Sequence, residues 1–249
     1  MTPEPRQMEL FRLPPPRGVA PDRRLLLNGR LIAYSLRRDR RRLSLRIDER
    51  GLGVGAPRNM PLQQIEAFIR EHAEWVKEKL DAAAQASAKR RLLIHEGALL
   101  PVLGATVRVR LVAGGGCGYW RQDELWLAAR PGADLTALAQ RALQRRMREY
   151  AQPQLLAAAQ QLGRPPPPLQ LTSARTRWGS CSAAGVIRLN WRLVHLAPQL
   201  VDYVIAHEAA HLLEMNHGPR FWKLVEELCP QWRAARQQLK GEAAQTPLL

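Results

Sequence analysis

Residues 206–222 read AHEAAHLLEMNHGPRFW, and this short stretch holds three of the six histidines in the chain. His207 and His211 are four residues apart, so on a helix both imidazoles project from the same face. Two imidazoles placed in this way can reach one metal ion at ~2.0–2.1 Å. Glu208 is turned ~100° around the helix, where its carboxylate can act on a water molecule without binding the metal. The pattern is that of an H-E-x-x-H metallohydrolase helix.

The third histidine of the stretch, His217, supplies a further ligand. A catalytic zinc ion needs three protein ligands and one open position. His217 lies six residues beyond His211, almost two turns away on a continuous helix, so the helix must end first. Asn216 tolerates a left-handed backbone, and the Gly-Pro pair at 218–219 suits the cap and first turn of a following helix. The sequence therefore predicts a zinc site formed by this histidine and the two in the helix.

Two other arrangements of ligands are conceivable. An acidic residue of the following segment, Glu226 or Glu227, could supply the third ligand instead. The same spacing of three histidines also occurs in metzincins. Metzincins have a glycine three residues past the second histidine, where this chain has Glu214, and a Met-turn downstream, whereas no methionine follows Met215. The residues around the histidines thus argue against a metzincin.

Composition limits the class of protein. The 249 residues include 38 Lys and Arg against 22 Asp and Glu, a net charge of +16. This excess reflects either a GC-rich genome, which raises the use of arginine, or attraction to a polyanion such as nucleic acid. The three cysteines are far apart and form no CxxC pair, which argues against a disulfide framework and for a reducing compartment. Cys181 lacks an evident partnered base, so we expect a buried small residue there and not a nucleophile.

No apolar run approaches the ~18 residues of a membrane span, and the N-terminus lacks the apolar region of a signal peptide. We therefore expect a cytoplasmic protein. Periodicity predicts an α+β fold that begins with antiparallel β-hairpins and a helix. The H-E-x-x-H motif predicts that a zincin-like core with a small sheet and the HExxH helix follows. The expected parts are a disordered tail (1–22), hairpins plus helix (23–95), small strands and a long helix (96–164), and the metal-binding core (165–240), with 96–240 forming one unit.

Several local features carry more detailed predictions. The Asn28-Gly29 pair predicts a two-residue hairpin turn. The basic cluster at 37–42 falls where a second hairpin turn is expected, either solvated or in contact with phosphate. Pro61 begins one helix whose apolar stripe runs from Leu62 through His72 and Trp75 to Leu80. The long helix further on is kinked or split at Pro153. No internal sequence repeat is visible.

The segments RTRWGSCSAAGVIRLNWRLV (175–194), VDYVIAHEAAHLLEMNHGPRFW (201–222) and CPQW (229–232) together resemble the YgjP-type family of bacterial metal-dependent hydrolases. This zincin group is related in motif to SprT-like proteins. Weaker similarity in RRRLSLRIDERGLGVGAP and IEAFIREHAEWVKEKL extends the resemblance over roughly residues 25–240. The resemblance implies that the three histidines bind zinc and that Glu208 is the catalytic residue. The chain departs from the family in the small pair at 209–210, where larger apolar residues are usual.

The segment before the HExxH helix is expected to contact substrate. In zincins a sheet edge beside the metal holds an extended substrate by main-chain pairing, and the strand near 186–191 is the candidate for that edge. Arg175, Arg177 and Asn190 are candidate donors to a tetrahedral oxyanion. We take Arg177, Asn190 and Trp191 as tentative substrate-binding residues.

These features favour a zinc-dependent metallopeptidase that cleaves peptide or protein substrates with water activated by the metal and a glutamate general base. The alternative is a nucleic-acid-associated protein with a structural or regulatory metal site. Glu208 discriminates between the two, because a structural site has no use for a carboxylate at that position. Nucleic-acid binding, if present, is expected to be weak, independent of sequence and salt-dependent.

Overall fold

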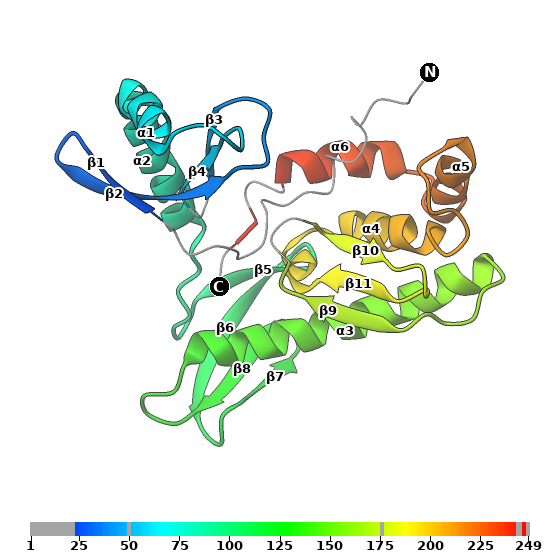
Figure 1. Ribbon diagram of the computed structural model, residues 1–249. Helices are drawn as coiled ribbons and strands as arrows, with labels where there is room; N and C mark the ends of the chain where they lie inside the picture. Colours follow the sequence, from blue (N-terminus) through cyan, green and yellow to red (C-terminus); the bar gives the residue numbers. More distant parts are fainter. Residues whose placement is uncertain (1–22, 49–50, 175–176, 243–245, 248–249) are drawn as a thin grey trace. The chain divides into compact units, whose positions relative to one another are not determined.

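The computed structural model describes residues 23–48, 51–174, 177–242 and 246–247 (Figure 1). Small sheets and six α-helices follow one another along this part of the chain, an α+β arrangement. The chain divides into two compact units, one ending at Arg91 and the other beginning at Leu92. The tail predicted at 1–22 lies outside the described residues. Among the helices described, none is both long and apolar enough to cross a membrane.

The first unit contains a four-stranded sheet of order β1-β2-β4-β3, formed by β1 (Arg23–Leu27), β2 (Arg30–Arg37), β3 (Ser44–Asp48) and β4 (Gly51–Gly55). The predicted Asn28-Gly29 turn is confirmed, because both residues have positive φ, 47° and 80°, and join antiparallel strands. The hairpin turn predicted at 37–42 is wrong. β2 pairs in parallel with β4, so the basic cluster belongs to a crossover. The buried side chains of Leu52 and Val54 give β4 the central position, and the more polar β3 takes the edge.

The single helix predicted after Pro61 is two helices, α1 (Leu62–Glu71) and α2 (Ala73–Arg90). His72 separates them with φ −102° and ψ 21°. Its Nδ1 lies 2.9 Å from the carbonyl oxygen of Phe68, so the imidazole competes with the backbone for this group. The break starts a new helical register, and Trp75, which the predicted stripe included, is 39% exposed.

The second unit begins with a sheet that repeats the topology of the first. Its strands β5 (Leu99–Val102), β6 (Ala105–Ala113), β7 (Cys117–Arg121) and β8 (Glu124–Ala129) have the order β5-β6-β8-β7, with a parallel central pair. The first turn again has two residues of positive φ, Leu103 and Gly104. The sequence shows no repeat because this topology needs only alternating apolar residues and a tight turn, which different residues can supply.

A long helix, α3 (Leu135–Gln161), crosses the second unit. The side chain of Asp134 caps it by accepting a hydrogen bond of 2.9 Å from the amide of Ala137. The helix is continuous through Pro153 and not split. Its buried residues lie on both sides of the proline. It ends as predicted at Gly163, which has φ of 64°. Its buried face comprises Leu138, Ala139, Ala142, Leu143, Met147, Ala151, Leu155 and Ala159.

The third sheet is small and has the order β10-β11-β9, with strands β9 (Leu169–Thr172), β10 (Gly179–Cys181) and β11 (Ile187–Asn190). The prediction that residues near 186–191 form the sheet edge is wrong. β11 is the central strand, and β10 and β9 are the two edges. Ile187 and Leu189 are fully buried, and such residues favour a strand covered by neighbours on both sides.

A 3₁₀ helix (Trp191–His195) and three α-helices complete the chain: α4 (Pro198–Ala210), α5 (Pro219–Leu228) and α6 (Trp232–Glu242). One hydrophobic core joins the sheet β5–β8, α3, the third sheet and these helices. The metal-binding candidates of α4 therefore project from a packed scaffold.

One buried histidine of this scaffold, His195, predicts a pH-dependent stability. The residue is 6% exposed, its Nδ1 lies 2.7 Å from the carbonyl oxygen of Pro101, and burial lowers its pKa to about 4. A folded-state pKa below the unfolded value of about 6.5 adds stability that is present above pH 6.5 and lost as the pH falls towards 4. We expect this histidine to account for ~3 kcal/mol of lost unfolding free energy between pH 7 and pH 4.

Urea denaturation of the wild type and of His195→Asn at both pH values measures this loss. The variant should lose less stability than the wild type by that amount, because asparagine does not titrate. Equal losses in the two proteins would show that His195 does not titrate in this range.

Candidate metal centre

The helix α4 fixes two of the three candidate ligands. Pro198 is its first residue and Ala210 its last, so His207 and Glu208 lie in the final turn and His211 directly follows it. The helix is buried on almost every side, so packing against the core fixes its position. The buried residues are Leu200, Val201, Tyr203, Val204, Ile205, Ala206, His207, Glu208, Ala209 and Ala210.

The chain turns sharply after α4 and brings His217 back. Gly218 caps α5 and Pro219 is its first residue, which confirms the prediction for this pair. Asn216, which tolerates a left-handed backbone, is not among the described residues with positive φ. Instead its carbonyl oxygen accepts a hydrogen bond of 2.8 Å from the amide of Gly218. This tight turn places His217 beside the end of α4.

The three histidines meet at one point. Each offers one ring nitrogen, and these atoms lie within 4.8 Å of one another. The Nε2 atoms of His207 and His217 are 3.1 Å apart. Two nitrogens bound at ~2.0–2.1 Å to a tetrahedral ion would be roughly 3.3 Å apart, so the spacing suits a shared metal. The exposed fraction of His207 is 3%, while the other two histidines are half-buried.

The surroundings favour neutral imidazoles, the form that binds metal. Burial lowers the pKa of His207 well below its ordinary value, and the neighbouring histidines and Arg236 lower it further. Burial also lowers the pKa of His211 and of His217. The Nδ1 of His211 lies 2.9 Å from the carbonyl oxygen of Glu214, a contact that orients the ring and leaves its Nε2 for a metal ion.

Aromatic rings line the side of the site formed by α5. The ring centroid of Phe221 lies 4.9, 4.6 and 4.6 Å from those of His207, His211 and His217. Trp222 stacks on Trp232 of α6 at 4.6 Å, and the guanidinium of Arg236 lies 4.8 Å above the Trp222 ring. These rings restrict the rotamers of the histidines and exclude water from one side.

Glu208 lies on the side of the site formed by the edge strand β10. It is 3% exposed, and burial raises its pKa to about 8 against the opposing effects of the Arg177 charge and a hydrogen bond from the Cys181 amide. A methyl group added to Gly179 would lie 2.5 Å from Oε1 and 2.6 Å from Cγ of this glutamate. The carboxyl group therefore rests directly against the bare backbone of β10.

The tentative substrate-binding residues have different positions. Arg177 is exposed and near enough to Glu208 to affect its pKa. Asn190 is 1% exposed and donates its amide to the carbonyl oxygens of Ala174 and Arg177 at 2.5 and 3.3 Å. Trp191 is fully buried, and its Nε1 donates to the hydroxyl of Ser173 at 3.2 Å.

The side chains of Asn190 and Trp191 are thus engaged in hydrogen bonds inside the fold. Arg177 remains as a candidate. Arg175, the other predicted oxyanion donor, lies outside the described residues. Reasoning from the sequence missed Gly179 and the aromatic rings of Phe221 and Trp222. The glycine gave no signal because its importance depends on the approach of β10 to α4.

The chain is similar to a known protein family and to a solved structure. The crystal structure of the metallopeptidase zymogen of Pyrococcus abyssi abylysin is 21% identical, with a TM-score of 0.36, and the match covers 39% of this chain and 99% of that one. A search of curated proteins finds no match. A family model described as YgjP-like, metallopeptidase domain, matches residues 41–242, most of the chain. The chain therefore belongs to the YgjP-like metallopeptidase family.

Proposed function

We propose that the protein is a zinc-dependent metallopeptidase with a zincin-like core, in which Glu208 is the general base. The observation that carries the proposal is the convergence of three histidine nitrogens within 4.8 Å, on the helix turn that also bears a buried glutamate. Membership of a metallopeptidase family supports hydrolysis of peptide bonds. The three-histidine donor set supports zinc, which prefers nitrogen ligands in tetrahedral sites.

His207, His211 and His217 would hold the metal. When bound, a zinc ion at such a site polarises the scissile carbonyl and lowers the pKa of water towards ~7. Glu226 and Glu227 are weaker candidates for the third ligand. Neither belongs to the group of converging donor atoms, and the carboxylate of Glu226 pairs with Arg233 at 2.5 Å.

Glu208 moves the proton in this proposal. Its carboxylate would accept a proton from the attacking water and return it to the leaving amine. Burial raises the pKa of Glu208 to about 8, whereas the Arg177 charge and the Cys181 amide favour the carboxylate form that acts as the base. The amide of Cys181 holds the carboxylate in place by donating a hydrogen bond to it.

The edge strand β10 would bind the substrate. It pairs only with β11 in the described part of the chain, so its other edge can pair with an extended peptide. Because Gly179 of this strand touches Glu208, a peptide lying along β10 would pass the base and the histidines. Arg177, exposed just before the strand, is the candidate donor to the developing oxyanion.

Metal analysis combined with peptide hydrolysis tests the function. Purified protein should contain about one zinc per chain and cleave an unfolded protein substrate such as reduced casein. A chelator should remove both the zinc and the activity, and added zinc should restore both. Full metal content without cleavage of any peptide or unfolded protein would favour the structural metal site of the alternative function.

Substitution of Gly179 by alanine should displace the base. The added methyl group would collide with Oε1, Cγ and Cδ of Glu208, all within 2.8 Å, and the buried carboxyl has little room to withdraw. Misplacing a reacting group by about 1 Å can cost about 10²-fold in rate, and we expect a loss of that size in kcat. Zinc content should stay near that of the wild type, because the alanine does not approach the histidines.

A matched control is Gly185→Ala, in the next turn, where the nearest atom to an added methyl group is 3.7 Å away. Gly185 has φ of 75°, so this change strains the backbone without touching Glu208. Activity near wild type in Gly179→Ala would show that the carboxyl group does not need its observed position.

A further inference from the structure

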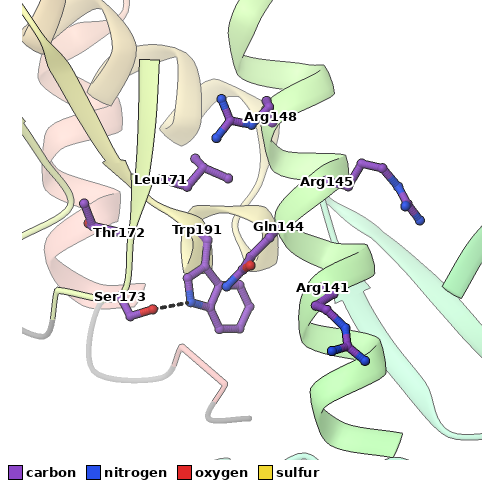
Figure 2. Close-up of a pocket in the computed structure, with 8 residues that line it drawn as sticks. All are labelled: Arg141, Gln144, Arg145, Arg148, Leu171, Thr172, Ser173 and Trp191. Atoms are coloured by element: carbon purple, nitrogen blue, oxygen red, sulfur yellow. Dashed lines mark hydrogen bonds between the residues drawn. The ribbon is translucent and has the colours of Figure 1, made fainter. Parts of the chain in front are cut away.

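A second surface lies on the opposite edge of the third sheet from β10. A hollow of about 350 Å³ separates the strand β9 from the helix α3. We call it the α3/β9 groove, and Figure 2 shows its lining. The residues that line it are Arg141, Gln144, Arg145, Arg148, Leu171, Thr172, Ser173 and Trp191.

One wall of the α3/β9 groove is strongly basic. Arg141, Arg145 and Arg148 follow one another at intervals of four and three residues, so their backbone positions form a stripe on one face of α3. All three are exposed, and in Figure 2 the side chain of Arg145 points away from β9. Within the described residues none of them pairs with a carboxylate: Arg145 donates to the carbonyl oxygen of Gly118, and Arg148 to that of Leu169. No acidic residue lines the groove. The positive charge of this wall is therefore not neutralised by the fold.

The other wall is an edge strand. β9 pairs in parallel with β11 and with no other strand of the described chain, so one side of its backbone is not used in a sheet. An unpaired edge can accept another extended chain by main-chain hydrogen bonds. The hydroxyl-bearing residues Thr172 and Ser173 continue this wall at the end of the strand.

The arginines are spread out rather than gathered at one point. In Figure 2 the guanidinium groups of Arg141, Arg145 and Arg148 lie at successive heights along α3 and point in different directions. Their positions on the helix rise by about 6.0 and 4.5 Å, from 1.5 Å per residue. Acidic side chains on one face of an extended peptide repeat every ~6.8 Å, two residues of strand, so such a peptide can present charges to arginines at different heights along α3. The stripe therefore suits an extended ligand with several negative charges, and not a single phosphate.

A peptide fits the groove better than a nucleic acid does. Proteins that bind single-stranded nucleic acid stack its bases on accessible aromatic rings. The one aromatic residue in the lining, Trp191, is fully buried and donates its indole N–H to Ser173. The outer edge of β9, in contrast, offers backbone donors and acceptors that match another polypeptide, and of these the Leu169 carbonyl oxygen accepts from Arg148.

We infer that the α3/β9 groove binds an extended acidic peptide segment of another protein. The segment adds a strand to β9 and directs its carboxylates towards Arg141 and Arg148. This surface is separate from the edge that carries Glu208, so the binding does not depend on the proposed catalytic chemistry. It gives the chain a second point of attachment for a partner or a substrate.

Fluorescence anisotropy with the full chain and a labelled eight-residue peptide of alternating Glu and Val tests the inference. The basic peptide of alternating Lys and Val should not bind.

Arg141→Glu should weaken binding of the acidic peptide about tenfold, since an attractive exposed pair becomes a repulsive one. Among the described residues, Arg141 has no hydrogen-bond or ion-pair partner, so the fold should tolerate this change. Arg164→Glu, on an exposed arginine beyond the C-terminal end of α3, makes the same charge change outside the groove and should leave binding nearly unchanged.

Two further arms make the result decisive. An acidic peptide that is N-methylated at alternate residues, in either of the two registers, tests strand addition: one register should abolish binding. Equal binding of both methylated peptides, or equal weakening by Arg141→Glu and Arg164→Glu, would overturn the inference. A labelled poly-dT oligonucleotide tests the other polyanion. If it binds more tightly than the acidic peptide and loses more affinity in Arg141→Glu, the groove is a nucleic-acid surface and the inference is wrong.

Discussion

Replacing Glu208 with glutamine is expected to lower the rate of peptide hydrolysis by ~10²–10⁴-fold, the usual contribution of a general base. Glutamine has nearly the same shape as glutamate and can still bond a water molecule, but it cannot accept the proton. The carboxyl group is buried against Gly179 and receives a hydrogen bond from the Cys181 amide, so the space it occupies is well defined. The amide group should fill that space without moving the helix.

Zinc content separates this role from that of a ligand. Because His207, His211 and His217 are unchanged, the glutamine variant should bind one zinc with the affinity of the wild type. The control is Glu227→Gln, which makes the same chemical change outside the cluster of donor atoms and should leave rate and metal content unchanged. If the Glu208 variant turned over a substrate at the wild-type rate, the proposed mechanism would be wrong. If it lost both zinc and activity, Glu208 would be a ligand.

The residues at the centre of the site were predictable because their relations are local. The spacing of His207 and His211 on one helix face follows from helix geometry alone. The cap at Gly218 and the start of α5 at Pro219 follow from the turn preferences of these residues. Asn216, which tolerates a left-handed backbone, does not adopt one, and its carbonyl oxygen accepts a backbone hydrogen bond from Gly218. Spacing and turn chemistry act over a few residues, and one sequence contains that information.

The features that the sequence did not predict depend on which distant segments pair. The choice of β11 as the edge strand failed because an apolar strand of four residues has the same pattern at the centre and at the edge of a sheet. Gly179 gave no sign of its contact with Glu208, since 29 residues separate them in the sequence. The parallel pairing of β2 with β4 likewise needs a crossover that local turn preferences do not encode. The pairing of strands that are distant in the sequence depends on which whole faces of the sheet become buried.

Removal of the third histidine, His217, is expected to weaken metal binding by a factor similar to the loss of rate in Glu208→Gln. In His217→Ala the metal would keep two protein ligands on one helix and lose the one that approaches from the turn before α5. Loss of an outer-sphere partner alone typically costs 10–100-fold in metal affinity, so loss of a direct ligand should cost more than about 100-fold. Titration of the metal-free protein against a zinc-buffering chelator measures this change directly, without reference to any substrate.

The same titration decides between the alternative third ligands. Glu226→Gln and Glu227→Gln should bind zinc as the wild type does, because neither carboxylate lies with the converging histidine nitrogens and Glu226 pairs with Arg233. His95→Ala serves as the control for losing a histidine elsewhere, since its Nδ1 contacts the carbonyl oxygen of Glu96 and not the site. Normal zinc affinity in His217→Ala, together with loss of affinity in either glutamate variant, would show that a glutamate of α5 is the third ligand. The turn at Gly218 would then serve only to connect the two helices.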